Sequence, residues 1–227
     1  MKRKSTTPGK IAVEPIGSTR ERIVQAAIHL FYEKGFAATG MAELLAKADA
    51  NSGSFYHFFE SKEDLLLAVL DWYEAGLEPV LLDPVRAQTT DPIERVFALL
   101  QGYRDRILMT EFAFGCPIGR LAMEIDPSRR EVHRKLAVNF ENWAAAVSSF
   151  LADAGDRLPP DVDLKKLGQF ALTVMEGGVM QSRSHRSIEP FDASVEQLRD
   201  YIGRLQVQAK ALKKGVSPSP KKKQRKR

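Results

Sequence analysis

Cysteine and long apolar segments are scarce in this sequence. Its 227 residues include one cysteine, Cys116, so an internal disulfide is excluded and a reducing compartment suits the chain. The longest unbroken apolar run, residues 65–70, is too short to span a bilayer. The apolar run at residues 11–13 is too short for the core of a signal peptide. We therefore expect a soluble cytoplasmic protein without a membrane partner.

Catalytic and metal-binding patterns are also missing. His133 and His185 have no cysteine or carboxylate set at metal-ligand spacing, and the sequence contains no glycine-rich phosphate loop, nucleophile elbow or HExxH motif. An enzyme with Cys116 as its nucleophile would need a general base nearby, and His133 lies beyond an expected helix boundary. We predict that the protein binds no metal and no cofactor and is not an enzyme.

Positive charge is concentrated at the two ends of the chain. The net charge is +5, yet residues 1–17 and 213–227 are strongly basic, which leaves the part between them acidic. Their polar composition predicts a disordered basic arm at 1–17 and a disordered basic tail at 214–227. The tail has three interpretations: a solvated end without a role, an accessory arm that binds DNA phosphates, or a targeting signal, since it resembles a short nuclear-import block.

Helical signals fill the rest of the chain, whereas useful strand-like alternation and internal repeats are absent. A capping box at Ser18 and Glu21 opens the first helix, and Gly35 ends it. Caps and prolines predict about nine helices and therefore an all-α fold. The later boundaries expected are a fourth helix from Ser61 to Pro79 or Pro84, a fifth from Asp91, a sixth from Pro117, a seventh from Asp126 to Gly155, an eighth from Asp161 or Asp163, and a ninth from Asp192 to about Lys213.

Two short helices near the N-terminus form a helix-turn-helix pattern. Residues 41–48 and 52–58 are joined by a tight turn at Asp49 and braced by the first helix. Gly53, Tyr56 and His57 share one face of the second short helix, and small polar residues followed by planar donors suit the DNA major groove. Three phenylalanines can pack inward from it: Phe55, Phe58 and Phe59.

The segment from residue 19 to residue 65 resembles the DNA-binding head of TetR/AcrR-type bacterial transcription regulators. Gly40 stands where that family usually has Ser or Thr, Asp49 where it usually has Gly, and Ala50-Asn51 where it usually has Val-Ser. The resemblance implies a helix-turn-helix domain at 18–64 and a ligand-binding and dimerisation domain at 65–213. The matching features are Ile23, Ala26-Ala27, Leu30-Phe31, Gly35-Phe36, Ala38-Thr39, Ala46, Gly53-Ser54-Phe55-Tyr56, Phe59 and Ser61-Lys62-Glu63-Asp64-Leu65.

The same resemblance implies the residues that meet DNA. They are Thr39, Gly40, Met41, Ser52, Gly53, Ser54, Tyr56, His57 and Lys62. Lys62 and the first amides of the fourth helix would hold a phosphate. The alternatives are that Tyr56 only packs in the core and that Lys62 is an ordinary solvated lysine. The implied partners are a double-stranded DNA operator with a pseudo-palindromic sequence and a second copy of the chain.

The last two expected helices carry apolar stripes at a spacing of three and four residues. In the family these helices meet their symmetry mates in a four-helix bundle, so the resemblance implies a homodimer interface here. Gly177-Gly178 would allow close helix approach, or would simply kink the helix. The expected interface residues are Leu167, Ala171, Val174, Gly178, Val195, Leu198, Ile202 and Leu205.

The segment from Gly115 to Glu124, GCPIGRLAME, resembles a motif of a subgroup of these regulators, some of which respond to reactive electrophiles or small unsaturated acids. Free amides at a helix start lower the pKa of a thiol, so Cys116 is a candidate reactive sensor, and the alternative is a buried small apolar residue. Further candidates for contact with an unknown small-molecule effector are Tyr103, Met109, Phe112, Phe114, Phe140, Trp143 and Met175.

These observations lead to one main functional hypothesis and one alternative. The main hypothesis is a sequence-specific DNA-binding transcription regulator, a repressor that a small-molecule ligand releases from its operator. The alternative is a DNA-bound interaction protein of the same fold, which a protein partner regulates.

Overall fold

The computed structural model describes residues 17–215, and every regular element in that range is helical. The all-α prediction is confirmed. Both basic ends lie almost entirely outside the described residues. The elements in chain order are α1 (Thr19–Lys34), α2 (Met41–Lys47), α3 (Ser52–Phe58), α4 (Lys62–Gly76), a π turn (Leu77–Leu82), α5 (Asp83–Gln88), α6 (Pro92–Met109), α7 (Pro117–Glu124), α8 (Arg130–Asp153), a 3-10 turn (Gly155–Arg157), α9 (Leu164–His185) and α10 (Glu189–Lys213).

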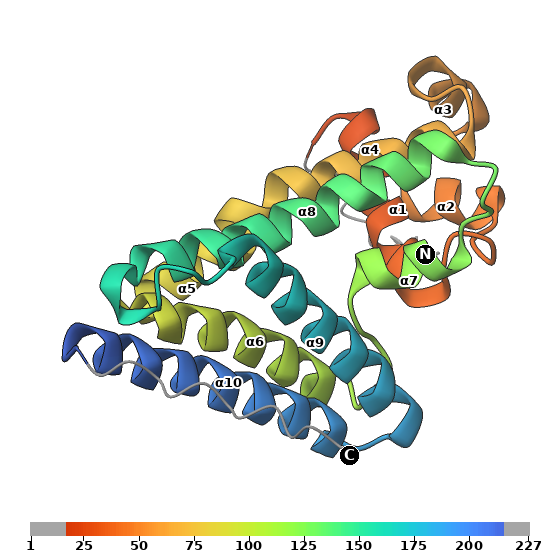
Figure 1. Ribbon diagram of the computed structural model, residues 1–227. Helices are drawn as coiled ribbons and strands as arrows, with labels where there is room; N and C mark the ends of the chain where they lie inside the picture. The colour runs from red at the N-terminus through yellow and green to blue at the C-terminus, as the bar shows by residue number, and fades with distance from the viewer. Residues whose placement is uncertain (1–16, 216–227) are drawn as a thin grey trace, which may run out of the picture.

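The N-terminal head consists of α1, α2 and α3 packed on the first turns of α4 (Figure 1). The capping box forms as expected: the backbone N–H of Glu21 donates to Ser18 Oγ at 3.3 Å, and the N–H of Ser18 donates to Glu21 Oε2 at 2.7 Å. The buried side chains of Phe31, Leu44 and Phe55 join the helices in one core. Each such burial stabilises the head by roughly 1.5–3 kcal/mol.

The fourth helix does not end at Pro79 or Pro84, contrary to the sequence prediction. The chain stays helical from α4 through the π turn into α5. If this continuous segment is counted once, the described residues form nine helices. Proline removes a backbone donor and crowds the preceding turn. The π turn that contains Pro79 absorbs this misfit, and Pro84 falls in the first turn of α5, where a missing N–H is tolerated.

Two other helix starts also differ from the sequence prediction. Asp126 does not open α8, because its carboxylate accepts the N–H of Ser128 at 2.8 Å in a separate turn. Asp192 does not open α10, which begins three residues earlier at Glu189, with Pro190 in its first turn. Polar caps and prolines therefore located these helices correctly but misplaced their first residues by about one turn.

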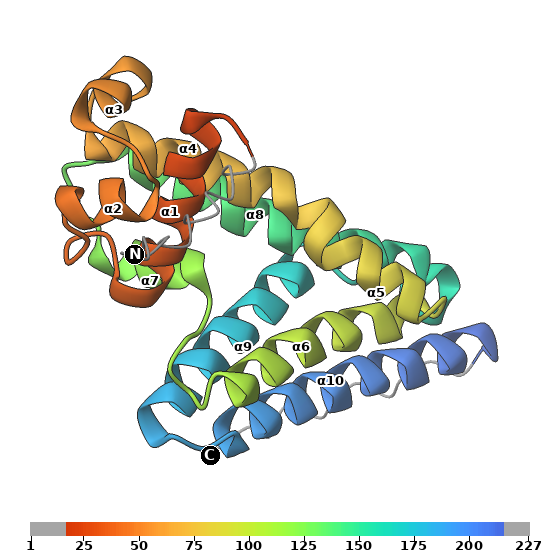
Figure 2. The same ribbon diagram turned by 180° about the vertical axis from the view of Figure 1, so that it is seen from behind.

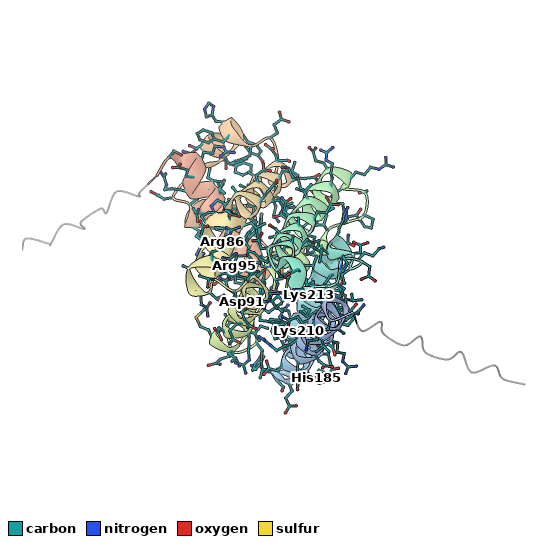
Figure 3. The ribbon with its side chains drawn as sticks, turned by 60° about the vertical axis from the view of Figure 1, so that its left-hand side comes forward. Arg86, Asp91, Arg95, His185, Lys210 and Lys213 are labelled. Atoms are coloured by element: carbon teal, nitrogen blue, oxygen red, sulfur yellow. The ribbon has the colours of Figure 1, made fainter. Side chains whose placement is uncertain are left out.

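The body is built from two helical layers. The rod of α4 and α5 runs beside α8, and α6, α9 and α10 lie side by side beneath it (Figures 1 and 2). Two ion pairs lie at the end of the body farthest from the head, Arg157 with Asp91 at 3.0 Å and Arg95 with Asp153 at 3.5 Å, and Figure 3 labels Asp91 and Arg95. Within residues 17–215, no helix combines the length and the apolar character that crossing a bilayer would need.

The expected dimer stripe on α9 and α10 faces the inside of the protomer. Leu198 and Ile202 are buried against neighbouring helices of the same chain, and a Cβ added to Gly178 would collide with the ring of Phe191. For the six residues that are buried within the protomer the prediction was wrong, because a helical spacing of apolar residues shows that a face is buried but not which helix covers it. Of the eight expected residues, two are half-buried, Val174 and Val195, and six are buried, Leu167, Ala171, Gly178, Leu198, Ile202 and Leu205.

A different face of these two helices is exposed. Phe170 on α9 and Tyr201 on α10 are 46 % and 47 % exposed, and their rings meet edge to face with centroids 6.2 Å apart. Met180 on α9 and Val207 on α10 are also exposed.

Candidate DNA-binding head and effector cavity

The short helix α3 projects from the head (Figure 1), and several of its polar residues are exposed. Asn51 caps it, with its side-chain oxygen accepting the N–H of Ser54 at 2.8 Å. Tyr56 is 64 % exposed, while Phe55 one residue earlier is fully buried and anchors the helix. Ser52, Gly53 and His57 are exposed as well, so the expected base-reading residues share one open surface. Gly40 is exposed at the start of α2, Met41 is half-buried, and Phe58 is exposed rather than packed inward.

Two of the expected DNA contacts are occupied within the head. The Thr39 side chain is buried, and its hydroxyl donates to the carbonyl of Gly35 at 2.7 Å. The Lys62 ammonium donates to the carbonyl of Phe36 and lies 4.5 Å from the centre of the Phe36 ring. Partial burial lowers the pKa of Lys62; the Glu124 carboxylate opposes this shift, and the Arg129 guanidinium adds to it. Lys62 is therefore neither a free phosphate ligand nor an ordinary solvated lysine in this structure.

The body contains a partly open cavity of about 430 Å³ that is lined from α4, the π turn, α5, α6, the start of α7, α8 and α9. This volume lies in the range typical of pockets for small organic molecules. Five of the expected effector contacts line it: Tyr103, Cys116, Phe140, Trp143 and Met175.

The remaining expected contacts lie elsewhere. Met109, the last residue of α6, is 76 % exposed, and Phe112 follows it in the turn with a left-handed backbone and packs against the core outside the cavity. Phe114 stacks on Tyr32 of the head, with ring centroids 4.8 Å apart. These three predictions were wrong as cavity contacts because α6 ends at Met109 and the chain then turns away from the cavity.

Sequence reasoning missed several residues of the cavity wall. Trp72 and Tyr73 enter from α4, Asn139 from α8 and Glu176 from α9. The sequence could have identified Glu176 as a candidate site residue, because it is the one acidic residue in the largely apolar sequence from residue 170 to residue 180. A carboxylate inside an apolar stripe is uncommon unless it is paired or has a function.

Cys116 lies at the start of a helix, as expected, but its thiol does not have the lowered pKa of a reactive cysteine. It is the N-cap of α7, and its Sγ accepts the N–H of Gly119 at 3.5 Å. Burial raises the pKa of the thiol well above its ordinary value, and the neighbouring carboxyl of Glu176 raises it further. These effects outweigh the lowering that the helix amides exert, so the thiol is protonated at neutral pH.

Helix α7 links the cavity to the head. Its first turn forms part of the cavity wall, and its last residue, Glu124, accepts the N–H of Phe36 at 2.9 Å and of Ala37 at 2.6 Å. From the middle of α7, Arg120 donates to the carbonyl of Tyr32 at 3.2 Å at the end of α1. We call this set of contacts the α7 clasp: Arg120 and Glu124 on α7, and the backbone of residues 32–37 in the head.

The clasp explains a glycine in the head. Gly35 has a φ of +91°, a conformation that L side chains rarely adopt, and a Cβ added there would collide with the carboxylate of Glu124. Gly35 is needed for the turn after α1 and for the approach of α7.

Comparison with known proteins agrees with both parts of this architecture. The family model described as bacterial regulatory proteins of the tetR family matches residues 23–69, and the model for the C-terminal domain of LmrA/YxaF-like transcriptional regulators matches residues 92–197. An uncharacterized HTH-type transcriptional regulator of Mycobacterium tuberculosis (strain ATCC 25618 / H37Rv) is 30% identical over 189 residues, which are 81% of this chain and 93% of that protein. The HTH-type transcriptional repressor DhaR of Mycobacterium sp. (strain GP1) is 26% identical over 179 residues, 76% of this chain and 86% of DhaR.

A solved structure adds a DNA complex to the comparison. The TetR family transcriptional regulator CifR, as a cysteine mutant with 26-bp double-strand operator DNA, matches with a TM-score of 0.68 and 25% identity over 82% of this chain and 97% of that chain. The named relatives are transcription regulators rather than enzymes, which is consistent with the expectation that this protein is not an enzyme. The two family models and the mycobacterial relative together show that the chain belongs to the TetR family of DNA-binding transcription regulators.

Proposed function

We propose that the protein is a cytoplasmic repressor that leaves its DNA operator when a small molecule enters the cavity between α4 and α9. The observation that carries this proposal is the α7 clasp, because a single short helix contributes to the cavity wall and also holds the end of α1. The repressor DhaR among the relatives supports the sign of regulation.

On the DNA side, the open face of α3 enters the major groove. Ser52, Gly53, Tyr56 and His57 meet bases or groove walls, and the backbone at the start of α2 meets a phosphate. Lys62 acts from within the head, where its contact with Phe36 positions the turn before α2. The CifR complex with operator DNA supports this mode of binding.

A pseudo-palindromic operator requires two heads, so we propose that the protein acts as a homodimer. The exposed face around Phe170 and Tyr201 supplies the contact between protomers, because it is the apolar surface of α9 and α10 that the protomer leaves uncovered. The stripe containing Leu198 belongs to the protomer core.

Release follows from differential binding. A ligand that fits the cavity only when the first turn of α7 shifts favours the state in which Glu124 no longer holds the head in place. Each tenfold preference for that state contributes about 1.4 kcal/mol to the shift in equilibrium.

Non-covalent sensing is favoured over thiol chemistry and over a protein partner. The Cys116 thiol is buried and protonated, so an electrophile meets a poor nucleophile. A cavity of about 430 Å³ between the helices suits a small molecule rather than a protein surface.

The test is selection of bound DNA fragments with the purified protein, followed by titration of the selected operator in the presence of candidate metabolites. Tyr56→Ala and His57→Ala should each weaken operator binding by about 5- to 150-fold, the equivalent of about 1–3 kcal/mol for a specific contact. His185→Ala is the matched control, because His185 is exposed at the far end of α9 (Figure 3). Equal affinity for all four proteins would remove α3 from the interface.

A further inference from the structure

Glu176 is an unpaired carboxyl group in the wall of the cavity. Its Oε1 atom is buried without a hydrogen-bond partner, and no basic side chain of residues 17–215 lies within 4.0 Å of its carboxylate. Glu74, on the same wall, shows the usual arrangement, because its carboxylate pairs with Lys135 at 3.5 Å. Glu176 thus lacks the cation that its neighbour has.

The absence of a paired cation is energetically unfavourable in the surroundings of Glu176. The cavity beside it is lined mostly by aromatic and aliphatic side chains, and the nearby Cys116 thiol offers Glu176 only a weak, uncharged hydrogen-bond donor. Burial raises the pKa of Glu176, because a charge that is removed from water without a partner is unfavourable. A protein that needed only packing here would be more stable with an apolar residue of similar size.

We propose that the cavity binds a lipophilic organic cation, an apolar body with a protonated amine, whose ammonium group pairs with Glu176. This inference rests on the proposed role of the cavity as the effector site and names the class of effector. The ammonium supplies the missing charge and hydrogen-bond donors, and the rings of Tyr103, Phe140 and Trp143 offer faces to the cation and to the apolar body.

The position of Glu176 also connects recognition to release. Its carboxylate lies against the Cα of Gly119 in the first turn of α7, so closely that a Cβ at Gly119 would collide with Oε2. A ligand that draws the carboxylate toward the cavity therefore changes its contact with the first turn of α7. The last residue of the same helix holds the head through the α7 clasp.

One basic side chain, Arg106, also lines the cavity. It is exposed, and no ion pair joins it to Glu176. A ligand with a carboxylate would be expected to pair with Arg106 instead. An anionic ligand and a cationic ligand should therefore differ in which of these two side chains they need.

The experiment compares three compounds of nearly equal shape by calorimetry on the full-length protein: biphenyl-4-ylmethanamine, biphenyl-4-ylmethanol and biphenyl-4-carboxylate. The amine should bind about 10- to 100-fold more tightly than the alcohol, the range expected for a hydrogen bond to a charged group, and the carboxylate should bind most weakly. Glu176→Gln keeps the shape and removes the charge, so the amine should fall to the affinity of the alcohol. Glu74→Gln is the matched control and should keep the preference for the amine.

Four results would overturn the proposal: equal affinity of amine and alcohol for the native protein, an amine preference that survives Glu176→Gln, tightest binding by the carboxylate, or no binding by any of the three. Thermal unfolding of Glu176→Gln checks that the variant is folded, and the loss of an unpaired buried charge should leave its midpoint unchanged or higher. Operator titration with the amine separates the two proposals. If the amine binds through Glu176 but the operator complex persists, ligand release fails while the ligand class stands.

Discussion

Replacement of Glu124 by alanine removes the two acceptors of the α7 clasp and leaves the cavity and the open face of α3 intact. In the native protein, the Glu124 carboxylate accepts the backbone N–H groups of Phe36 at 2.9 Å and Ala37 at 2.6 Å. Both donors lie in the turn that joins α1 to α2. The change therefore affects how the helix-turn-helix is attached to the body, and leaves its DNA-binding surface unchanged.

The magnitude follows from the type and exposure of these bonds. A hydrogen bond to a charged group contributes roughly 1.5–3 kcal/mol when it is shielded from water. Glu124 is half-buried and Ala37 is exposed, so the lower part of that range applies, and the pair should contribute about 2–3 kcal/mol to the free energy of unfolding. For a chain of this size, that loss corresponds to a fall in the thermal midpoint of roughly 4–12 °C. Glu124→Gln retains one acceptor and should fall between the two proteins.

The variant should resemble the ligand-bound state, because Glu124 no longer holds the head. We expect Glu124→Ala to bind operator DNA more weakly than the native protein without ligand, and to lose little further affinity when biphenyl-4-ylmethanamine is added in the same titration. Glu131→Ala is the matched control, because Glu131 on α8 forms only an exposed ion pair with Arg134. An unchanged thermal midpoint together with an intact ligand response would refute the assignment of the clasp as the link between cavity and head.

The remaining predictions concern the interface between protomers and the thiol. Phe170→Glu combined with Tyr201→Glu should give a folded monomer by light scattering and circular dichroism, because both side chains are exposed in the protomer. Leu198→Glu buries an unpaired charge and should instead unfold the chain, at a cost of roughly 3–5 kcal/mol. Iodoacetamide should label Cys116 at least roughly tenfold more slowly in the native protein than in denaturant, since burial excludes the reagent and keeps the thiol protonated. Rapid native labelling would reopen the electrophile hypothesis.

The sequence by itself determined the helices and the surface of α3, because both depend on neighbours along the chain. The capping box at Ser18, the Asn51 cap and the spacing of Phe55 and Tyr56 act within one or two helical turns, and the structure reproduces them. The resemblance to TetR-type heads used the same local pattern, and the family model covers most of that segment.

Only the tertiary structure decided what each buried or polar group meets. Leu198 and Phe170 are both apolar residues on the hairpin of α9 and α10, yet Leu198 is buried and Phe170 is exposed. Which of them is buried depends on packing against helices that are distant in sequence. The amides at the start of α7, which are close to Cys116 in sequence, lower the pKa of its thiol. Burial and the carboxyl group of Glu176, which depend on the tertiary structure, raise it and have the larger effect. The contact of Glu124 with Phe36 joins residues 88 positions apart, and periodicity and capping carry no information over that distance, because they describe only a helix and its own ends.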